Sequence, residues 1–295
     1  MKEKTVMRGC AQDRALLGVN AVLMAVFAII IAYPLLFIVF ASFEGSSATM
    51  SLSLLPKKWT LAGYRAVAEY RWVWVGYLNS AIYTALGTVI GLVVCILAAY
   101  PLAQGDLPGH GWIMGLFLFT MYFGGGLIPY YVTIMQLGMI NTFWVMVIPG
   151  AISAYNVIVF KTFFMSIPEA LRESASLDGA GHVRILFQIV LPLSKAVLAT
   201  FALFSIVGYW NDYMTALLYL RDDTKYPIQL LMRRLLVLMD YKDASTAQML
   251  KDFQKISTRT TKAAATIITV VPVLCVYPFM QKHFAKGVLV GSIKA

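Results

Sequence analysis

The sequence predicts an all-α, polytopic membrane protein with six transmembrane helices, and two observations carry that prediction. Of its 295 residues, 60% are hydrophobic and 13% are charged, whereas a typical soluble domain is about 25% charged. Several uncharged runs are longer than the roughly 20 residues that a helix needs to cross a bilayer. Membrane-spanning helices joined by short polar segments explain both the composition and the spacing of the charges.

The six elements follow from the apolar runs, taken in order. Ala15–Phe43 carries no charge and gives the first span, and Leu78–Leu102 is the core of a second uncharged run. Leu107–Phe160 contains no Asp, Glu, Lys or Arg and is too long for one span, so we divide it at Gln136–Thr142. Two later apolar runs complete the set. The expected spans are residues 15–43, 78–102, 112–135, 143–164, 190–218 and 263–281 of a spanning domain 15–282, with tails at 1–14 and 283–295.

Two glycine clusters in the apolar runs predict special packing. Gly87 and Gly91 form a G-x-x-x-G pattern, which lets helices approach closely but also arises often by chance. Gly124–Gly126 and Pro129 lie inside the third span, where a broken helix is tolerated only if protein or a water-filled cavity satisfies its backbone. We therefore expect this break at a subunit interface or beside a water-filled pathway, with ordinary helix packing as the alternative.

The polar stretch Ser166–Pro192, between the fourth and fifth spans, is the most informative part of the chain. It reads SIPEALRESASLDGAGHVRILFQIVLP. Ser166 and Glu169 match a capping box, so a short helix is expected to begin here. Gly179 is expected to end that helix, because glycine adopts the left-handed conformation without steric cost. Apolar residues from Val183 onward then restart a helical stripe that leads into the fifth span.

A spaced motif within this stretch consists of Glu173, Ser174, Ala175, Gly179, Ile189, Leu191 and Pro192. It resembles the EAA loop of the membrane subunits of bacterial ABC importers, whose pattern is E-A-A, three residues, G, nine residues and I-x-L-P. The spacing fits throughout, and Ser174 in place of the second alanine is the one departure. An amphipathic connector without a partner is the alternative interpretation of residues 166–192.

The resemblance extends over nearly the whole chain. The segments that carry it are TMYFGGGLIPYY, LGMINTFWVMVIPGAIS, GYWNDY and YPFMQKHFAKGVLVGSIKA. They resemble the carbohydrate-uptake branch of these importers, and most of all its smaller, six-span permease subunit. Within that branch they are similar to the group for complex oligosaccharides and polysaccharides, which includes the alginate importer. The implied fold is that of a type I ABC importer permease with a cytoplasmic coupling helix.

This resemblance also implies partners and a location. A second, homologous permease would complete the pathway, and two cytoplasmic ATPase subunits would bind ATP and Mg²⁺. An extracytoplasmic binding protein would deliver the saccharide. The chain itself is expected to be a transport subunit without cofactor, metal or nucleic acid, in a bacterial inner membrane with both termini in the cytoplasm. The net charge of +10 is spread over segments that flank the spans, which does not indicate a nucleic-acid surface.

Two sets of candidate site residues follow from the same resemblance. In the ATPase-coupling set, Glu173 would pair with a basic residue of the ATPase, Gly179 would turn the chain, and Asp178 would cap the following turn. Its members are Glu173, Ser174, Ala175, Asp178 and Gly179. The substrate-pathway set combines aromatic rings with hydrogen-bonding groups: Tyr122, Tyr130, Asn156, Tyr209, Trp210, Asn211 and Asp212. The alternative is that Asp212 marks the membrane boundary and that the aromatic residues form an interfacial belt.

Two other functional classes compete with a permease subunit. A membrane enzyme would need a nucleophile–base pair or metal ligands inside the bilayer, but His110, His182 and His283 all fall in predicted loops or tails. A secondary active transporter would be expected to carry internal repeats and midplane charges, and neither is visible. The sequence also has no G-x-x-x-x-G-K-[ST] loop, so ATP hydrolysis would come from separate subunits.

Overall fold

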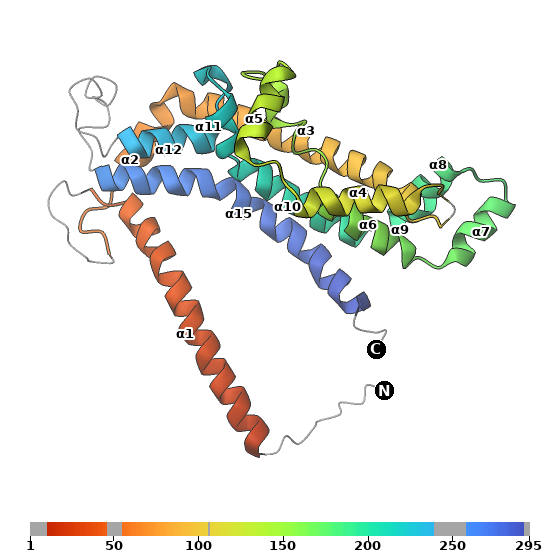
Figure 1. Cartoon of the computed structure of the whole chain (residues 1–295). Coiled ribbons are helices and arrows are strands. Elements are labelled where there is room, and N and C mark those ends of the chain that lie inside the picture. The colour runs from red at the N-terminus through yellow and green to blue at the C-terminus, as the bar shows by residue number, and fades with distance from the viewer. Residues whose placement is uncertain (1–10, 46–54, 106, 239–257, 292–295) are drawn as a thin grey trace. The chain divides into compact units, whose positions relative to one another are not determined.

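The computed structural model describes residues 11–45, 55–105, 107–238 and 258–291, in which all long elements are helices (Figure 1). The predicted all-α class is confirmed. Extended pairing within these ranges is limited to a single antiparallel bridge between Glu44 and Trp59. The chain forms two compact units, residues 1–69 with 241–268 and residues 70–240 with 269–295.

Three helical segments of the described chain are long and apolar enough to cross a membrane: Leu16–Ser42, Arg71–Leu102 and Arg259–Val276. Two bent pairs also qualify if each pair forms one span, namely His110–Tyr122 with Leu127–Gln136 and His182–Leu193 with Lys195–Asn211. The described residues therefore hold three to five candidate spans, and Ala154–Met165 is a shorter apolar helix. A multi-pass membrane protein accounts for these helices, while the count of six spans stays a prediction.

The first unit contains α1 (Ala11–Ser42), α2 (Ala62–Glu69) and the beginning of α15 (Thr258–Gly291). Large apolar side chains are exposed along α1, and none of its most apolar window is buried. A helix that is apolar all round requires lipid or another chain around it. Its C-terminal end is fixed by α2 and α15. The Ser42 and Tyr64 hydroxyls lie 2.7 Å apart, and the Thr260 hydroxyl donates to the Glu44 carbonyl at 2.7 Å.

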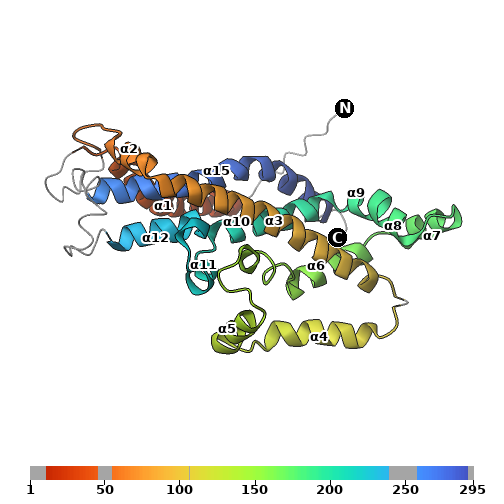
Figure 2. The same cartoon turned by 90° about the horizontal axis from the view of Figure 1, so that it is seen from above.

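The second unit is built around α3 (Arg71–Leu102), which packs along α10 (Lys195–Asn211), α6 (Ala154–Met165) and α12 (Ile228–Leu238) (Figure 2). The G-x-x-x-G pattern explains how closely these helices approach. A Cβ on Gly87 would lie 2.4 Å from the Tyr209 ring of α10, and one on Gly91 would lie 3.2 Å from the Ala151 carbonyl oxygen. The predicted small-residue packing face is therefore confirmed.

The other elements of the second unit are short. They are α4 (His110–Tyr122), α5 (Leu127–Gln136), the 3-10 turn η1 (Phe143–Met146), α7 (Glu169–Leu177), α8 (His182–Ile185), the π-helical segment η2 (Leu186–Val190), α9 (Leu191–Leu193), α11 (Met214–Tyr219) and the 3-10 turn η3 (Asp223–Lys225). The expected helix break at Gly124–Gly126 is observed: α4 and α5 meet at 116°, and Gly126 has a φ of +82°.

Two expected spans differ from the observed helices. Residues 143–164 begin with η1 and become α-helical only at Ala154, because Pro149 and Gly150 disfavour a continuous helix. Residues 190–218 contain a bend of 81° near Ser194, and α10 ends at Asn211. The π-helical segment and Pro192 precede this bend, and the buried Ser194 hydroxyl donates to the Val190 carbonyl at 2.6 Å.

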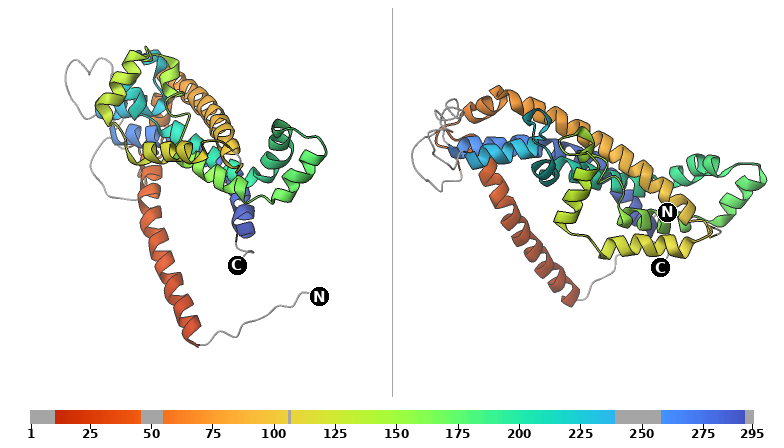
Figure 3. Two further views of the ribbon diagram at one scale, coloured as in Figure 1. Left: turned by 45° about the vertical axis from the view of Figure 1, so that its right-hand side comes forward. Right: turned by 45° about the horizontal axis from the view of Figure 1, so that its top comes forward.

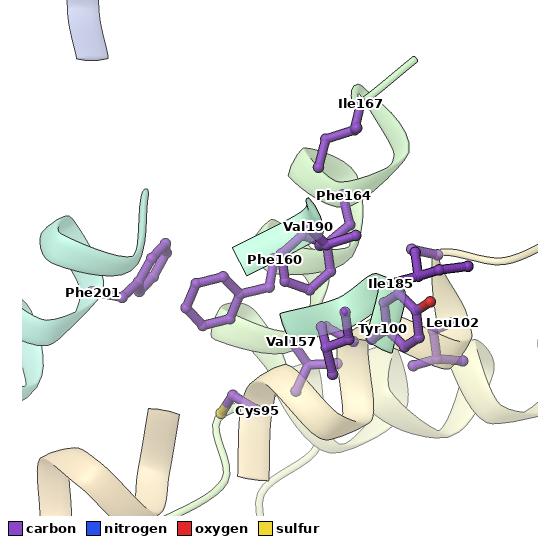
Figure 4. Packing of buried hydrophobic residues seen from close by; sticks show 13 residues of the cluster. Cys95, Tyr100, Leu102, Val157, Phe160, Phe164, Ile167, Ile185, Val190 and Phe201 are labelled. Carbon is purple, nitrogen blue, oxygen red and sulfur yellow. The ribbon is translucent and has the colours of Figure 1, made fainter. Parts of the chain in front are cut away.

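One hydrophobic core joins α3, α6, the α8–η2 segment and α10 (Figure 4). Phe160 of α6 lies at its centre and is fully buried, and its ring centroid is 4.8 Å from that of Phe201 on α10. Val157 and Phe164, one helical turn to either side, extend the same face of α6. The core continues through Ile167 and Ile185, which stand before and after α7.

Candidate functional site

The candidate coupling helix, α7, lies at one end of the second unit (Figures 1 and 3). The predicted capping box at its start is wrong. The Ser166 hydroxyl donates to the Phe163 carbonyl at 2.7 Å and so closes α6, while Pro168 occupies the N-cap of α7 without a side-chain cap. Only three residues separate the two helices, so Ser166 serves the end of the first rather than the start of the second.

The end of α7 is formed as predicted, by Gly179. Its φ is +79°, its N–H donates to the Ser176 carbonyl at 3.0 Å, and the next N–H, from Ala180, donates to the Ala175 carbonyl at 2.9 Å. These two bonds constitute a Schellman motif. The predicted capping of the next turn by Asp178 is wrong. That carboxylate is exposed and makes no hydrogen bond to the described residues, and α8 has no side-chain cap.

Both ends of α7 are fixed in the hydrophobic core. Ile167, just before the helix, is 6% exposed, and Ile185, in the segment that follows, is 3% exposed. Ala175 packs against the same core from within α7. The opposite side of the helix is open: Glu173 and Ser174 are exposed. A short helix held at both ends and open on one side can receive a partner chain and move as a rigid body with the core.

A pocket of about 550 Å³ lies beside the exposed face of α7. Glu173 and Arg172 line it from α7, Tyr100 lines it from the last turn of α3, and Gln104 lines it from the segment just after α3. The Arg172 Nε and the Tyr100 hydroxyl are buried without a hydrogen-bond partner among the described residues. The site therefore offers an exposed carboxylate for a cation, next to donors that have spare hydrogen-bonding capacity.

The four consecutive residues of the substrate-pathway set lie at the end of α10 and have different environments. Trp210 is 7% exposed and donates from its indole N–H to the Thr269 carbonyl at 3.0 Å. Tyr209 packs over Gly87. Asp212 accepts from the Thr215 N–H at 3.0 Å, which caps the start of α11. These contacts give Trp210, Tyr209 and Asp212 structural roles, whereas Asn211 is exposed.

The remaining members of that set lie on three other elements. Tyr122 ends α4 and is 75% exposed, and Tyr130 on α5 is 47% exposed, so the two residues flank the break at Gly124–Gly126. Asn156 is in the first turn of α6 and is half-buried. The structure gathers Tyr209–Asp212 but does not bring these three residues to one another through any described contact. Their roles in a pathway stay predictions.

Sequence reasoning missed the polar face of α12. Gln229 donates from Nε2 to the Asn211 Oδ1 at 3.1 Å, and the Arg233 guanidinium lies over the Tyr213 ring, 4.4 Å from its centroid. The signal was present in the sequence, because Gln229 and Arg233 are four residues apart in a helix whose other residues, apart from Arg234, are apolar.

Comparisons with known proteins agree with this arrangement. The permease protein YtcP of the polygalacturonan/rhamnogalacturonan transport system of Bacillus subtilis strain 168 is 39% identical over 273 residues, covering 92% of this chain and 95% of the relative. The protein LplC of the same organism is 39% identical over 263 residues, covering 88% of each chain.

Solved structures give the same result for the fold. A chain of a bacterial ABC transporter involved in the import of the acidic polysaccharide alginate superposes with a TM-score of 0.86 at 30% identity, covering 94% of this chain and 99% of that chain. A chain of the alginate transporter in complex with an alginate pentasaccharide-bound periplasmic protein shares the fold, with a TM-score of 0.56 at 15% identity. The family described as binding-protein-dependent transport system inner membrane component matches residues 5–290, and this chain belongs to it.

Proposed function

We propose that this chain is a permease subunit of an ATP-driven ABC importer, and that it forms a saccharide pathway with a second, homologous permease. The observation that carries the proposal is α7, an exposed helix of nine residues fixed at both ends in the core. Such a helix can dock into an ATPase subunit and transmit its movement. The chain is then a transport subunit, and ATP and Mg²⁺ are bound by the two ATPase partners.

The substrate is an oligo- or polysaccharide that carries carboxylates, with an alginate-like chain as one example. Support comes from the relative whose name specifies polygalacturonan and rhamnogalacturonan and from the importer of the acidic polysaccharide alginate. These polymers share uronic-acid units, each with one carboxylate. An extracytoplasmic binding protein delivers the saccharide, by analogy with the alginate transporter that was solved in complex with a pentasaccharide-bound periplasmic protein.

Movement of the ATPase subunits drives the cycle. ATP binding closes the ATPase dimer, and Glu173 transmits the closure through a charge-assisted pair with a basic residue of the ATPase. The core that holds Ile167 and Ile185 moves with α7 and opens the pathway outward. In this scheme α7 and both termini are cytoplasmic, in a bacterial inner membrane. The Asn211 end of α10 is then on the extracytoplasmic side.

Reconstitution tests the proposal. The chain is purified with its partner permease, ATPase subunits and binding protein and placed in proteoliposomes, and uptake of a radiolabelled galacturonate trisaccharide is measured. We expect uptake that requires internal ATP and persists when ionophores collapse the ion gradients. Uptake without ATP that follows an ion gradient would instead identify a secondary active transporter.

A further inference from the structure

Two neighbouring arginines of α12 differ in one respect. Arg233 and Arg234 each stack on a tyrosine ring, at 4.4 Å from Tyr213 and 4.3 Å from Tyr226. Arg234 also forms an ion pair with Asp223 at 2.9 Å and donates to the Tyr226 hydroxyl at 2.9 Å. Within the described chain, the Arg233 guanidinium has no carboxylate or hydrogen-bond acceptor. Its Tyr213 contact therefore holds an exposed cation in place without neutralising it.

The position of Arg233 is fixed by the packing of its helix. Ile228, Met232 and Leu235 are buried on the face of α12 that packs on the unit. Gln229 and Arg233 share another face, since they are four residues apart. That face lies along the end of α10, where Gln229 bonds Asn211 and Arg233 covers Tyr213. Two contacts in matching order, 229 with 211 and 233 with 213, define the register of α12 against this segment.

The free groups on this face of α12 are complementary to an acidic sugar. An arginine guanidinium carries five N–H donors in a planar fork that matches a carboxylate in two parallel hydrogen bonds. The Gln229–Asn211 pair uses one donor and one acceptor, which leaves an amide oxygen on Gln229 and amide N–H groups on Asn211. A sugar ring that carries one carboxylate and several hydroxyls could engage all three side chains.

We propose that Arg233 binds a carboxylate of the transported saccharide, and that Gln229 and Asn211 bind hydroxyl groups of the same or the next sugar. The inference rests on the proposed function and assigns a residue to its substrate class. Asp212, which lies between the two contacts, accepts the Thr215 N–H at the start of α11 through Oδ1. The neutral amides favour a saccharide over a protein carboxylate, because a sugar supplies hydroxyls beside its acid group.

The test compares Arg233→Gln and Arg233→Lys with Arg234→Gln in the complete reconstituted transporter. The control removes the same charge from the next residue. It breaks the exposed ion pair with Asp223, which contributes little to stability, together with the Tyr226 contacts. Uptake is measured for a galacturonate trisaccharide and for the same trisaccharide with one carboxyl group reduced to an alcohol. The concentration of liganded binding protein is varied to separate the apparent KM for docking from the maximal rate.

For Arg233→Gln we expect the maximal rate with the fully charged trisaccharide to fall about tenfold to hundredfold, because a charge-assisted bidentate contact is lost. The loss with the partly reduced sugar should be smaller, and the KM for docking should not change. Arg233→Lys should recover part of the rate, since it keeps the charge but not the fork. Arg234→Gln should affect both sugars equally and slightly.

Three results would overturn the assignment. An unchanged maximal rate in Arg233→Gln, or an equal loss of rate for both sugars, would show that Arg233 does not bind the carboxylate. A raised KM for docking at an unchanged maximal rate would show that Arg233 pairs with a carboxylate of the binding protein. If the unaltered transporter imported neither sugar, the proposed function itself would be wrong. The uptake measured for the wild type shows this independently of the variants.

Discussion

Replacing Gly179 should impair transport in proportion to how poorly the new residue adopts a left-handed backbone. The φ of Gly179 is +79°, and an added Cβ would meet no atom within 4 Å. Steric clash inside this chain therefore adds nothing to the free-energy cost of the substitution. The cost comes from holding a residue with a Cβ in the left-handed conformation. For an alanine it is about 1–2 kcal/mol, and a β-branched valine should cost more. Asparagine adopts this region more readily and should cost least.

The conformational cost acts directly on the position of α7. One to two kcal/mol changes the ratio of two conformations by a factor of about 5–30. In Gly179→Ala, the Schellman motif at the end of α7 should therefore open in a measurable fraction of molecules, and in Gly179→Val in most of them. The rest of the core should be largely unaffected, because Gly179 is not part of it.

The assay is ATP-driven uptake by the reconstituted transporter, together with hydrogen exchange at the Ala180 amide, which donates to Ala175 in the intact motif. Uptake should rank wild type, Gly179→Asn, Gly179→Ala and Gly179→Val in falling order, and exchange should rank in the reverse order. Binding of the saccharide to the external binding protein should be the same in all four. If Gly179→Asn were as inactive as Gly179→Val with normal exchange, the limit would be space for a partner, and the backbone explanation would be wrong.

Three further predictions concern other parts of the structure. Glu173→Lys should abolish uptake and weaken co-purification of the ATPase, because it reverses one of the exposed charges of α7. Normal uptake would contradict this prediction, and Arg184→Glu is the exposed control outside that helix. Gly87→Ala should lower the thermal stability of the purified protein by about 1–3 kcal/mol, since its Cβ would lie 2.4 Å from the Tyr209 ring. Gly115→Ala on α4, which meets nothing within 4 Å, should be neutral, and equal losses in both would refute the packing argument. Asp212→Asn should keep uptake because the amide oxygen can still cap α11, whereas Asp212→Ala should cost about 1 kcal/mol in an unfolding measurement; a transport defect in Asp212→Asn with normal stability would restore a pathway role.

Local sequence signals predicted the parts of the site that depend on few residues. Gly179 ends α7 as expected because the left-handed conformation is a property of one residue and its immediate hydrogen bonds. The Gly124–Gly126 break is local in the same sense. Ser166 shows the limit of such signals. Its hydroxyl could bond either to the end of α6 or to the start of α7, and the sequence pattern does not distinguish these two partners.

Features that depend on distant contacts could not be predicted in the same way. Tyr209 stays a predicted pathway residue, and its position over Gly87, more than a hundred residues away in the chain, adds a packing role that the sequence does not show. The bend at Ser194 follows Pro192, which is a sequence signal for a break, but it also follows the π-helical segment η2, for which the sequence has no comparable signal. Arg233 differs from Arg234 only through contacts that the sequence does not show: Arg233 stacks on Tyr213, whereas Arg234 is paired with Asp223.

The two proposed sites lie on elements that share one core. Ile167 and Ile185 fix α7 in the same cluster as Phe201 of α10, and α10 ends at Asn211, where Gln229 and Arg233 are found. The irregular point between them is the bend at Ser194, which the buried hydroxyl and the Val190 carbonyl stabilise. A displacement of α7 must therefore either carry the core and α10 with it, or change this bend and separate Phe201 of α10 from the rest of the core. In the first case the Asn211 end and the bound sugar move together, and in the second the angle at Ser194 separates the movement of α7 from the movement of the sugar site.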